Sequence, residues 1–114
     1  MLIYFSSKKV EKLCCNQKES LKKLGPIISI KLIKIVGLLK ELKCLNEVVL
    51  IPSLRFHKLK GDRQNQYSIT ISKDSPYRLI LIPIDIDTKQ NKLNSKEFET
   101  IVKIEILEVS KHYD

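Results

Sequence analysis

Hydrophobic positions along the first half of the chain predict a short strand followed by helices. Residues 2–5 form a β-prone apolar run, and the serines at 6–7 offer an N-cap to a helix that begins directly after it. Apolar side chains then recur at helical spacing. Asn16 followed three residues later by Glu19 resembles a capping box, which predicts the start of a second helical stretch.

The second helical stretch is interrupted at Gly25-Pro26, and Pro26 suits the first turn of a new helix. From residue 27 to residue 43 the helical pattern continues. Its apolar arc is wide, so we expect this helix to pack on more than one neighbour. One predicted face carries Ile28, Leu32, Ile35, Leu39 and Leu42, the arc is extended by Ile27, Ile30, Ile33, Val36 and Leu38, and the polar face carries Lys31, Lys34, Lys40 and Lys43.

The periodicity changes to that of strands after Pro52. Residues 54–60 alternate between two faces, and residues 67–72 alternate with apolar side chains inward and hydroxyls outward. Residues 77–82 are mostly apolar and predict a central strand, and residues 101–109 predict the last strand. The polar, turn-rich segment 85–98 is interpreted as a long surface loop.

These elements predict one α+β domain over residues 1–114, with the order β-α-α-β-β-β-β. We expect an antiparallel sheet packed on a helical hairpin whose outer surface is basic. The length suits a single domain, and the hydrophobic fraction of 43% is too high for a disordered basic tail.

The charge of the chain is unevenly distributed. The net charge is +8, with 13 Lys and Arg against 4 Glu in residues 1–60, and 8 Lys and Arg against 9 Asp and Glu in residues 61–114. A sequence pI near 9.4 points to an anionic partner such as nucleic acid, a membrane surface or an acidic protein. Composition does not choose among these, and many basic domains bind no specific partner.

The spacing of the cysteines and the absence of known catalytic motifs argue against several classes of chemistry. Cys14, Cys15 and Cys44 form no C-x-x-C pair, which argues against a zinc or redox centre, and we expect buried thiols in a reducing cytoplasm. The sequence contains no Gly-rich phosphate loop and no H-E-x-x-H motif. We therefore expect no metal and no cofactor, and lysines within the apolar stretches argue against a membrane span.

The segment around His57 is the main candidate for chemistry. His57 stands among Arg55, Lys58 and Lys60, so one imidazole and three cations fall on a predicted strand. His57 shares a face with Leu59 if the strand is regular. The alternative is a surface strand with solvated lysines and a hydrogen-bonded histidine.

Arg78 and the chain end add further candidates. Arg78 is the one charge in an apolar strand, so it needs either a carboxylate, such as Glu108 or Asp62, or a phosphate in a cleft. His112 and Tyr113 lie at the end of the last strand, where side chains are often without function.

Side chains of these types are sufficient for metal-free RNA cleavage. A base takes the proton of a ribose 2′-OH, cations hold the scissile phosphate, and an acid protonates the leaving 5′-oxygen. A weak general base makes such an enzyme slow unless something outside the chain positions the RNA.

Four blocks of the sequence form a recognisable series, which is Phe5-x-Ser7-Lys8-Lys9-Val10-Glu11-Lys12-Leu13-Cys14, His57-x-Leu59-Lys60-Gly61-Asp62, Gln66-Tyr67-Ser68-Ile69 and Pro76-Tyr77-Arg78-Leu79-Ile80. Gly25-Pro26 and the final Glu108-Val109 belong to the same series. With these blocks in this order, the sequence resembles the HigB branch of the RelE/ParE toxin superfamily nearly from end to end.

The resemblance implies a type II toxin with a fold like that of the microbial ribonucleases. It implies a cytoplasmic, metal-free endoribonuclease that cuts mRNA in the A site of the 70S ribosome. Its partners are then a helix-turn-helix antitoxin of the HigA type and, through that antitoxin, operator DNA. By position, His57 and Lys60 match family catalytic residues. The family's terminal Asp-Tyr-His is replaced here by Lys111-His112-Tyr113, with Asp114 after it.

Three functions follow as hypotheses. In the first, the chain is an mRNA endoribonuclease in which His57, Lys60, Arg78, His112 and Tyr113 are catalytic, and Arg55, Lys58 and Arg63 bind RNA. In the second, it is a ParE-like inhibitor of DNA gyrase with the same fold. In the third, it is a basic RNA-binding module without toxicity, although its seven Tyr and Phe are scattered rather than interleaved with the cations.

Overall fold

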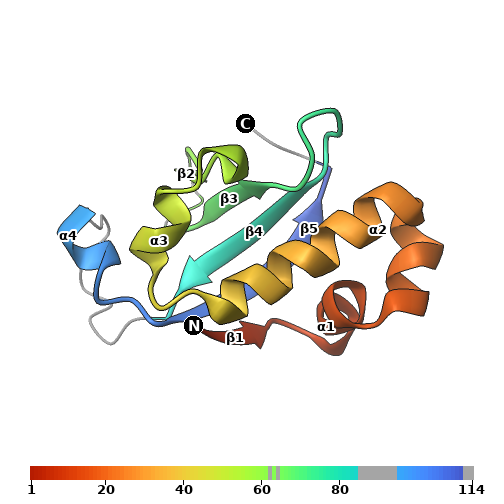
Figure 1. Ribbon diagram of the computed structural model, residues 1–114, viewed down its shortest axis with the longest axis horizontal. Coiled ribbons are helices and arrows are strands. Elements are labelled where there is room, and N and C mark those ends of the chain that lie inside the picture. Colours follow the sequence, from red (N-terminus) through yellow and green to blue (C-terminus); the bar gives the residue numbers. More distant parts are fainter. Residues whose placement is uncertain (62, 64, 85–94, 112–114) are drawn as a thin grey trace.

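The computed structural model of the 114-residue chain describes residues 1–61, 63, 65–84 and 95–111. Within these residues the chain is an α+β fold, in which helices lie against one face of a mixed sheet (Figure 1). The helices are α1 (Lys8–Cys15), α2 (Gln17–Glu41), α3 (Leu45–Val49), the 3-10 helix η1 (Pro52–Leu54) and α4 (Ser95–Phe98). The strands are β1 (Leu2–Phe5), β2 (His57–Lys58), β3 (Tyr67–Thr70), β4 (Arg78–Pro83) and β5 (Lys103–Ser110).

The strands form one sheet in the order β1-β5-β4-β3-β2. The predicted α+β class and the central place of β4 are confirmed, but the expectation of a wholly antiparallel sheet is wrong. β1 pairs with β5 in parallel, with Ile3 opposite Ile104, whereas the other pairs are antiparallel. A parallel pair needs a long crossover connection, and here all the elements between β1 and β5 supply it.

The two predicted helix N-caps are confirmed. The Ser7 hydroxyl accepts a hydrogen bond from the backbone N–H of Val10 at 3.2 Å, and Oδ1 of Asn16 accepts one from the N–H of Glu19 at 3.0 Å. Each bond satisfies an N–H that has no partner within its own helix. The sequence therefore separates α1 from α2 by local chemistry alone.

The predicted interruption at Gly25-Pro26 is also confirmed. Gly25 has φ 82° and ψ 168°, which is outside the helical region, and Pro26 follows it as the chain resumes its helix. A glycine adopts such angles without a steric penalty, and proline lacks the N–H that the break leaves without an acceptor. α2 is consequently two helical segments joined by a kink.

The second segment of α2 crosses the sheet in front of β4 and β5, as Figure 1 shows. Its buried stripe packs in one cluster with the aliphatic side chains of the sheet. Contrary to the expected wide arc, Ile27 and Ile30 are 68% and 51% exposed, because the covering elements reach only one side of the helix. The cluster includes Ile28, Leu32, Val36 and Leu39 of α2 and Leu79, Leu81, Ile104 and Ile106 of the sheet.

The predicted strand at residues 54–60 is largely wrong. Pro52 opens the 3-10 helix η1, Arg55 takes a left-handed conformation after it, and only His57–Lys58 is paired as β2. Proline pre-sets the helical φ, and the turn it starts leaves little length for a strand. The segment predicted as a loop at 85–98 contains the helix α4, and its residues 85–94 lie outside the described part of the chain.

Two expectations about side-chain exposure are corrected. The hydroxyl-bearing side chains of the 67–72 segment do not face solvent, since Ser68, Thr70 and Ser72 are all buried. Of the cysteines, only Cys14 is fully buried, whereas Cys15 is exposed and Cys44 is half-buried. None of the described helices combines the length and the apolar character that a bilayer crossing requires.

The backbone of Gly25 makes a matched pair of glycine substitutions informative. Gly25→Ala places a β-carbon at φ 82°, so we expect it to lower the free energy of unfolding by about 1–3 kcal/mol. Gly37→Ala lies within regular helix with open space around its β-carbon, and we expect it to raise stability by about 0.5–1 kcal/mol. Urea unfolding of both variants measures the difference, and equal effects would contradict the kink.

The neighbouring cysteines Cys14 and Cys15 are expected to differ in reactivity. Burial raises the pKa of the Cys14 thiol to about 12, with a smaller contribution from Cys15 and an opposing one from Lys40. The thiolate is the reactive form, so native Cys14 resists iodoacetamide near neutral pH while the exposed Cys15 is alkylated. Peptide mass spectrometry before and after urea unfolding checks this. Equal native labelling of the two thiols would be the contrary result.

Candidate active site

The His57 ring is exposed, and its orientation is set by a backbone carbonyl. Nδ1 of His57 lies 2.9 Å from the carbonyl oxygen of Arg55. Because a carbonyl only accepts, we assign the proton of the neutral ring to Nδ1, which leaves the lone pair on Nε2. The neutral ring is therefore held in the tautomer that carries its proton on Nδ1.

The local backbone explains how that carbonyl comes to lie beside the ring. Arg55 follows η1 as its C-cap, with φ 45° and ψ 47°, in the left-handed region that non-glycine residues seldom adopt. Its N–H donates to the carbonyl of Pro52 at 3.1 Å. Backbone in sparsely populated regions is often found where side chains are positioned for function.

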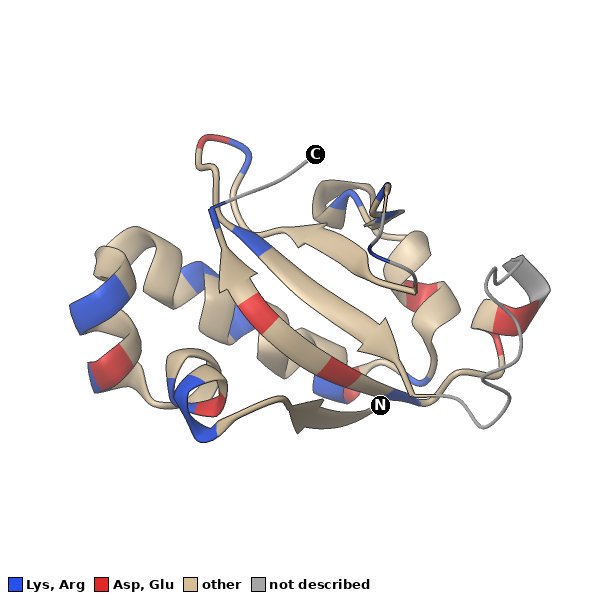
Figure 2. Cartoon of the chain, turned by 180° about the vertical axis from the view of Figure 1, so that it is seen from behind, with Lys and Arg blue, Asp and Glu red and all other residues tan. Residues whose placement is uncertain are grey.

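The register of the sheet places His57 on the face turned away from α2. We define this outer face by His57, Ser68, Ile80 and Glu108, which stand in one row across the antiparallel strands, together with Arg78. Successive side chains of a strand alternate between faces, and the neighbours of Ser68 and Ile80 on their strands belong to the core. Figure 2 views the molecule from this side, with acidic and basic positions along β4 and β5.

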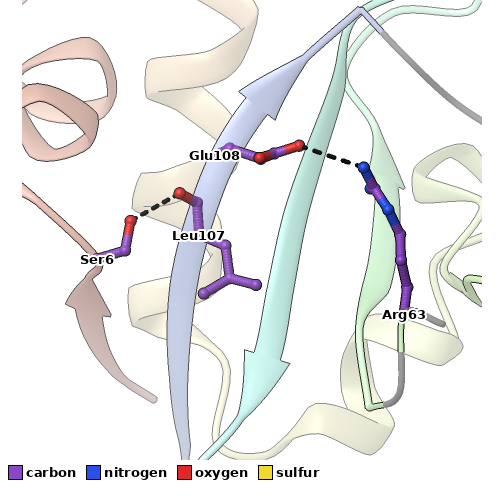
Figure 3. A network of polar contacts seen from close by, with 4 residues as sticks. All are labelled: Ser6, Arg63, Leu107 and Glu108. Carbon is purple, nitrogen blue, oxygen red and sulfur yellow. Dashed lines mark hydrogen bonds and ion pairs between the residues drawn. The ribbon is translucent and has the colours of Figure 1, made fainter.

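A bulge in β5 brings Glu108 onto the outer face. The register shifts between Ile80 and Leu81, so Glu108 stands opposite Ile80 while Ile106 stands opposite Leu81, and Leu107 is the extra residue. The Ser6 hydroxyl donates to the Leu107 carbonyl at 2.7 Å, as Figure 3 shows. Without the extra residue, Glu108 would be opposite Leu79 and directed at the core.

Glu108 forms an ion pair across the outer face. Nη2 of Arg63 lies 3.9 Å from its Oε1, and the two side chains are 42% and 47% exposed. Figure 3 shows Arg63 reaching toward Glu108 from the connection between β2 and β3. The sequence placed Arg63 among RNA-binding residues and offered Glu108 as a possible partner of Arg78, whereas the structure pairs Glu108 with Arg63. A bulge one residue long leaves no mark in the pattern that could have identified it.

Arg78 is half-buried at the start of β4, two residues along the strand from the row of His57 and on the same face. It lies between Thr70 of β3 and Ser110 of β5. Its Nη1 donates to the carbonyls of Ser75 and Tyr77 at 2.8 and 2.9 Å. Strands are about 4.8 Å apart, so the backbones of β2 and β4 are separated by roughly 10 Å, with β3 and its buried Ser68 between them.

The other predicted residues surround this centre. Lys58 pairs with Tyr67 and is half-buried on the opposite face from His57, and Lys60 is exposed beside Gly61, whose φ of 76° turns the chain. His112 and Tyr113 lie outside the described residues, as do Asp62 and Asp114. Lys111, the last described residue, lies over the ring of Tyr77, with its Nζ 5.4 Å from the centroid.

The structure thus brings His57, Arg78, Arg63 and Glu108 to one face of the sheet. His57 offers a proton acceptor, and the two arginines offer positive charge to an anion. Glu108 already pairs with one of them, Arg63. In the described part of the chain, no group of three or more His, Cys, Asp or Glu side chains could hold a metal ion.

Comparison with known proteins adds no relative. A scan against models of protein families, a search of curated proteins and a search of solved structures each found no match.

The pairing of Arg63 with Glu108 is expected to contribute little to folding. Both side chains are well exposed, so a double-mutant cycle with Arg63→Ala and Glu108→Ala should give a coupling energy below about 1 kcal/mol, decreasing as salt is added. Denaturant unfolding of the four proteins measures it. A coupling well above this value that is insensitive to salt would mean that the pair is structural and that Arg63 is not available to a ligand.

Proposed function

We propose that the chain is the toxin of a type II toxin–antitoxin module and a ribosome-dependent mRNA endoribonuclease. The observation that carries the proposal is the fixed imidazole of His57 on the same face of the sheet as Arg78. The end-to-end resemblance to HigB-type toxins supports the same assignment, with the RelE/ParE-like fold as part of the proposal. The observed α+β class agrees with that fold at the coarser level.

The proposed reaction needs no metal. Nε2 of His57 takes the proton of a ribose 2′-OH, and the 2′-oxygen attacks the adjacent phosphorus. The bond from phosphorus to the 5′-oxygen breaks, leaving a 2′,3′-cyclic phosphate, and an acid protonates the departing oxygen. Arg78 and Lys60 neutralise the phosphate, and His112 or Tyr113 supplies the acid.

The remaining cations fit the partners of such an enzyme. Arg63 lies on the outer face and steers RNA toward His57, whereas Lys58 on the opposite face and Arg55 beside α2 add attraction at longer range. The large positive charge of residues 1–60 suits both ribosomal RNA and an acidic antitoxin. We include in the proposal a helix-turn-helix antitoxin that carries the complex to operator DNA.

The role of His57 is tested by inducing the chain in growing bacteria and mapping mRNA ends by primer extension. The unmodified chain should arrest growth and produce codon-linked cuts, and His57→Ala should lower cutting by about 10²–10⁴-fold because the proton acceptor is lost. Lys22→Ala, at an exposed position of α2, is the control and should cut normally. Circular dichroism should show all three chains folded.

Three other results contradict the proposal. Unchanged cutting by His57→Ala means that this ring is not the base. Growth arrest with DNA damage and no mRNA cuts supports the gyrase inhibitor. The hydrogen bonds of Arg78 to backbone carbonyls also suit that function, because an arginine with a structural role need not contact a phosphate. Normal growth on induction supports an RNA-binding module without toxicity.

A further inference from the structure

A groove of about 480 Å³ lies on the helical side of the molecule, between α2, η1 and the end of β3. We name it the basic groove. Its described lining includes the four cations Lys31, Lys34, Arg55 and Lys73, and no carboxylate. Like charges gathered without a counter-charge raise the local potential, so the groove attracts an anionic partner.

The floor of the basic groove is aliphatic. It is formed by Ile35, Leu38, Ile51, Leu54 and Ile71, which come from α2, η1 and the residues beside η1 and β3. Its volume falls in the range of about 300–1,000 Å³ that is common for binding pockets. A partner that fills it therefore has to bring apolar side chains as well as negative charge.

One hydrogen bond crosses the basic groove. Nζ of Lys31 on α2 donates to the hydroxyl of Ser72, which follows β3, at 3.1 Å. Beside the groove, Ile30, Lys34 and Leu38 are four residues apart on α2 and lie on one face of the helix. Ile30 and Leu38 are 51% and 36% exposed, so an apolar rim accompanies the cations.

We infer that the basic groove binds an acidic amphipathic peptide segment of a partner protein, with aliphatic side chains on its floor and carboxylates at its cations. A nucleic acid is the less suitable occupant, because the described lining offers no aromatic ring for base stacking and aliphatic side chains gain little from a sugar-phosphate chain. The inference deepens the proposed function, on which it rests only for the identity of the partner as an antitoxin.

The groove is distinct from the candidate active site but shares one residue with it. Arg55 lines the groove with its side chain, while its carbonyl accepts the hydrogen bond from His57. A peptide seated at Arg55 is thus two residues along the chain from the proposed base. Binding there can influence the orientation of His57 without covering the outer face.

The test uses the full chain and a synthetic, fluorescently labelled peptide of about 14 residues, roughly 20 Å long as a helix. The peptide carries Leu at helical spacing on one face and Glu on the other. Fluorescence anisotropy should give a dissociation constant on the order of 10 µM. Lys34→Glu and Leu38→Asn should each weaken binding about tenfold, whereas the matched control Lys22→Glu should change it less than about twofold.

Three other results of this binding assay would contradict the inference. A scrambled peptide of equal composition that binds as tightly shows attraction by charge alone, and this overturns the inference. A single-stranded oligouridine that outcompetes the peptide and loses affinity with Lys34→Glu assigns the groove to nucleic acid. Equal effects of Lys34→Glu and Lys22→Glu place the peptide elsewhere. Peptide binding is measured without ribosomes and needs no RNA cleavage, so its failure is separate from that of the proposed enzyme.

Discussion

The fold depends on the position of β5, which lies between the first strand and the central strand of the sheet. Its backbone bonds to β1 in parallel on one side and to β4 in antiparallel on the other. Ile104 and Ile106 of the same strand are fully buried beneath the helices. The bulge at Leu107 then turns Glu108 onto the outer face. One strand thus joins the edge of the sheet to its centre, contributes to the core and shapes the candidate site.

Local sequence chemistry accounts for the parts of the fold that could be predicted. The caps at Ser7 and Asn16 and the break at Gly25-Pro26 depend on neighbouring residues only, and all three are present. The parallel pairing of β1 could not be predicted, because hydrophobic alternation is the same in parallel and antiparallel edge strands. The strand predicted after Pro52 is mostly absent for another reason. A short 3-10 turn and a left-handed Arg55 carry no periodic signal, so the alternation of residues 54–60 predicts a strand where the chain turns.

The candidate site was predictable in its residue types and less so in its geometry. His57 and Arg78 attract notice because an imidazole and a lone arginine are rare in this chain, and the sheet does place both on one face. The carbonyl that fixes the His57 ring and the bulge that presents Glu108 depend on backbone detail at single residues. Pattern reasoning over windows of several residues averages such detail away. The groove beside Arg55 was missed because its walls come from segments distant in sequence.

The place of β5 has a consequence for how the chain acquires its structure during synthesis. A ribosome makes β1 first, yet the partner of β1 is formed by residues 103–110. Until those residues leave the ribosome, β1 has no neighbour, β4 lacks one of its two pairing strands, and Ile3 and Leu79 lack their register partners Ile104 and Val109. Contacts between such distant residues form slowly, since a long loop must close before they are made. The nascent chain is therefore without a finished sheet, and without the outer face built on it, until nearly the whole sequence has emerged.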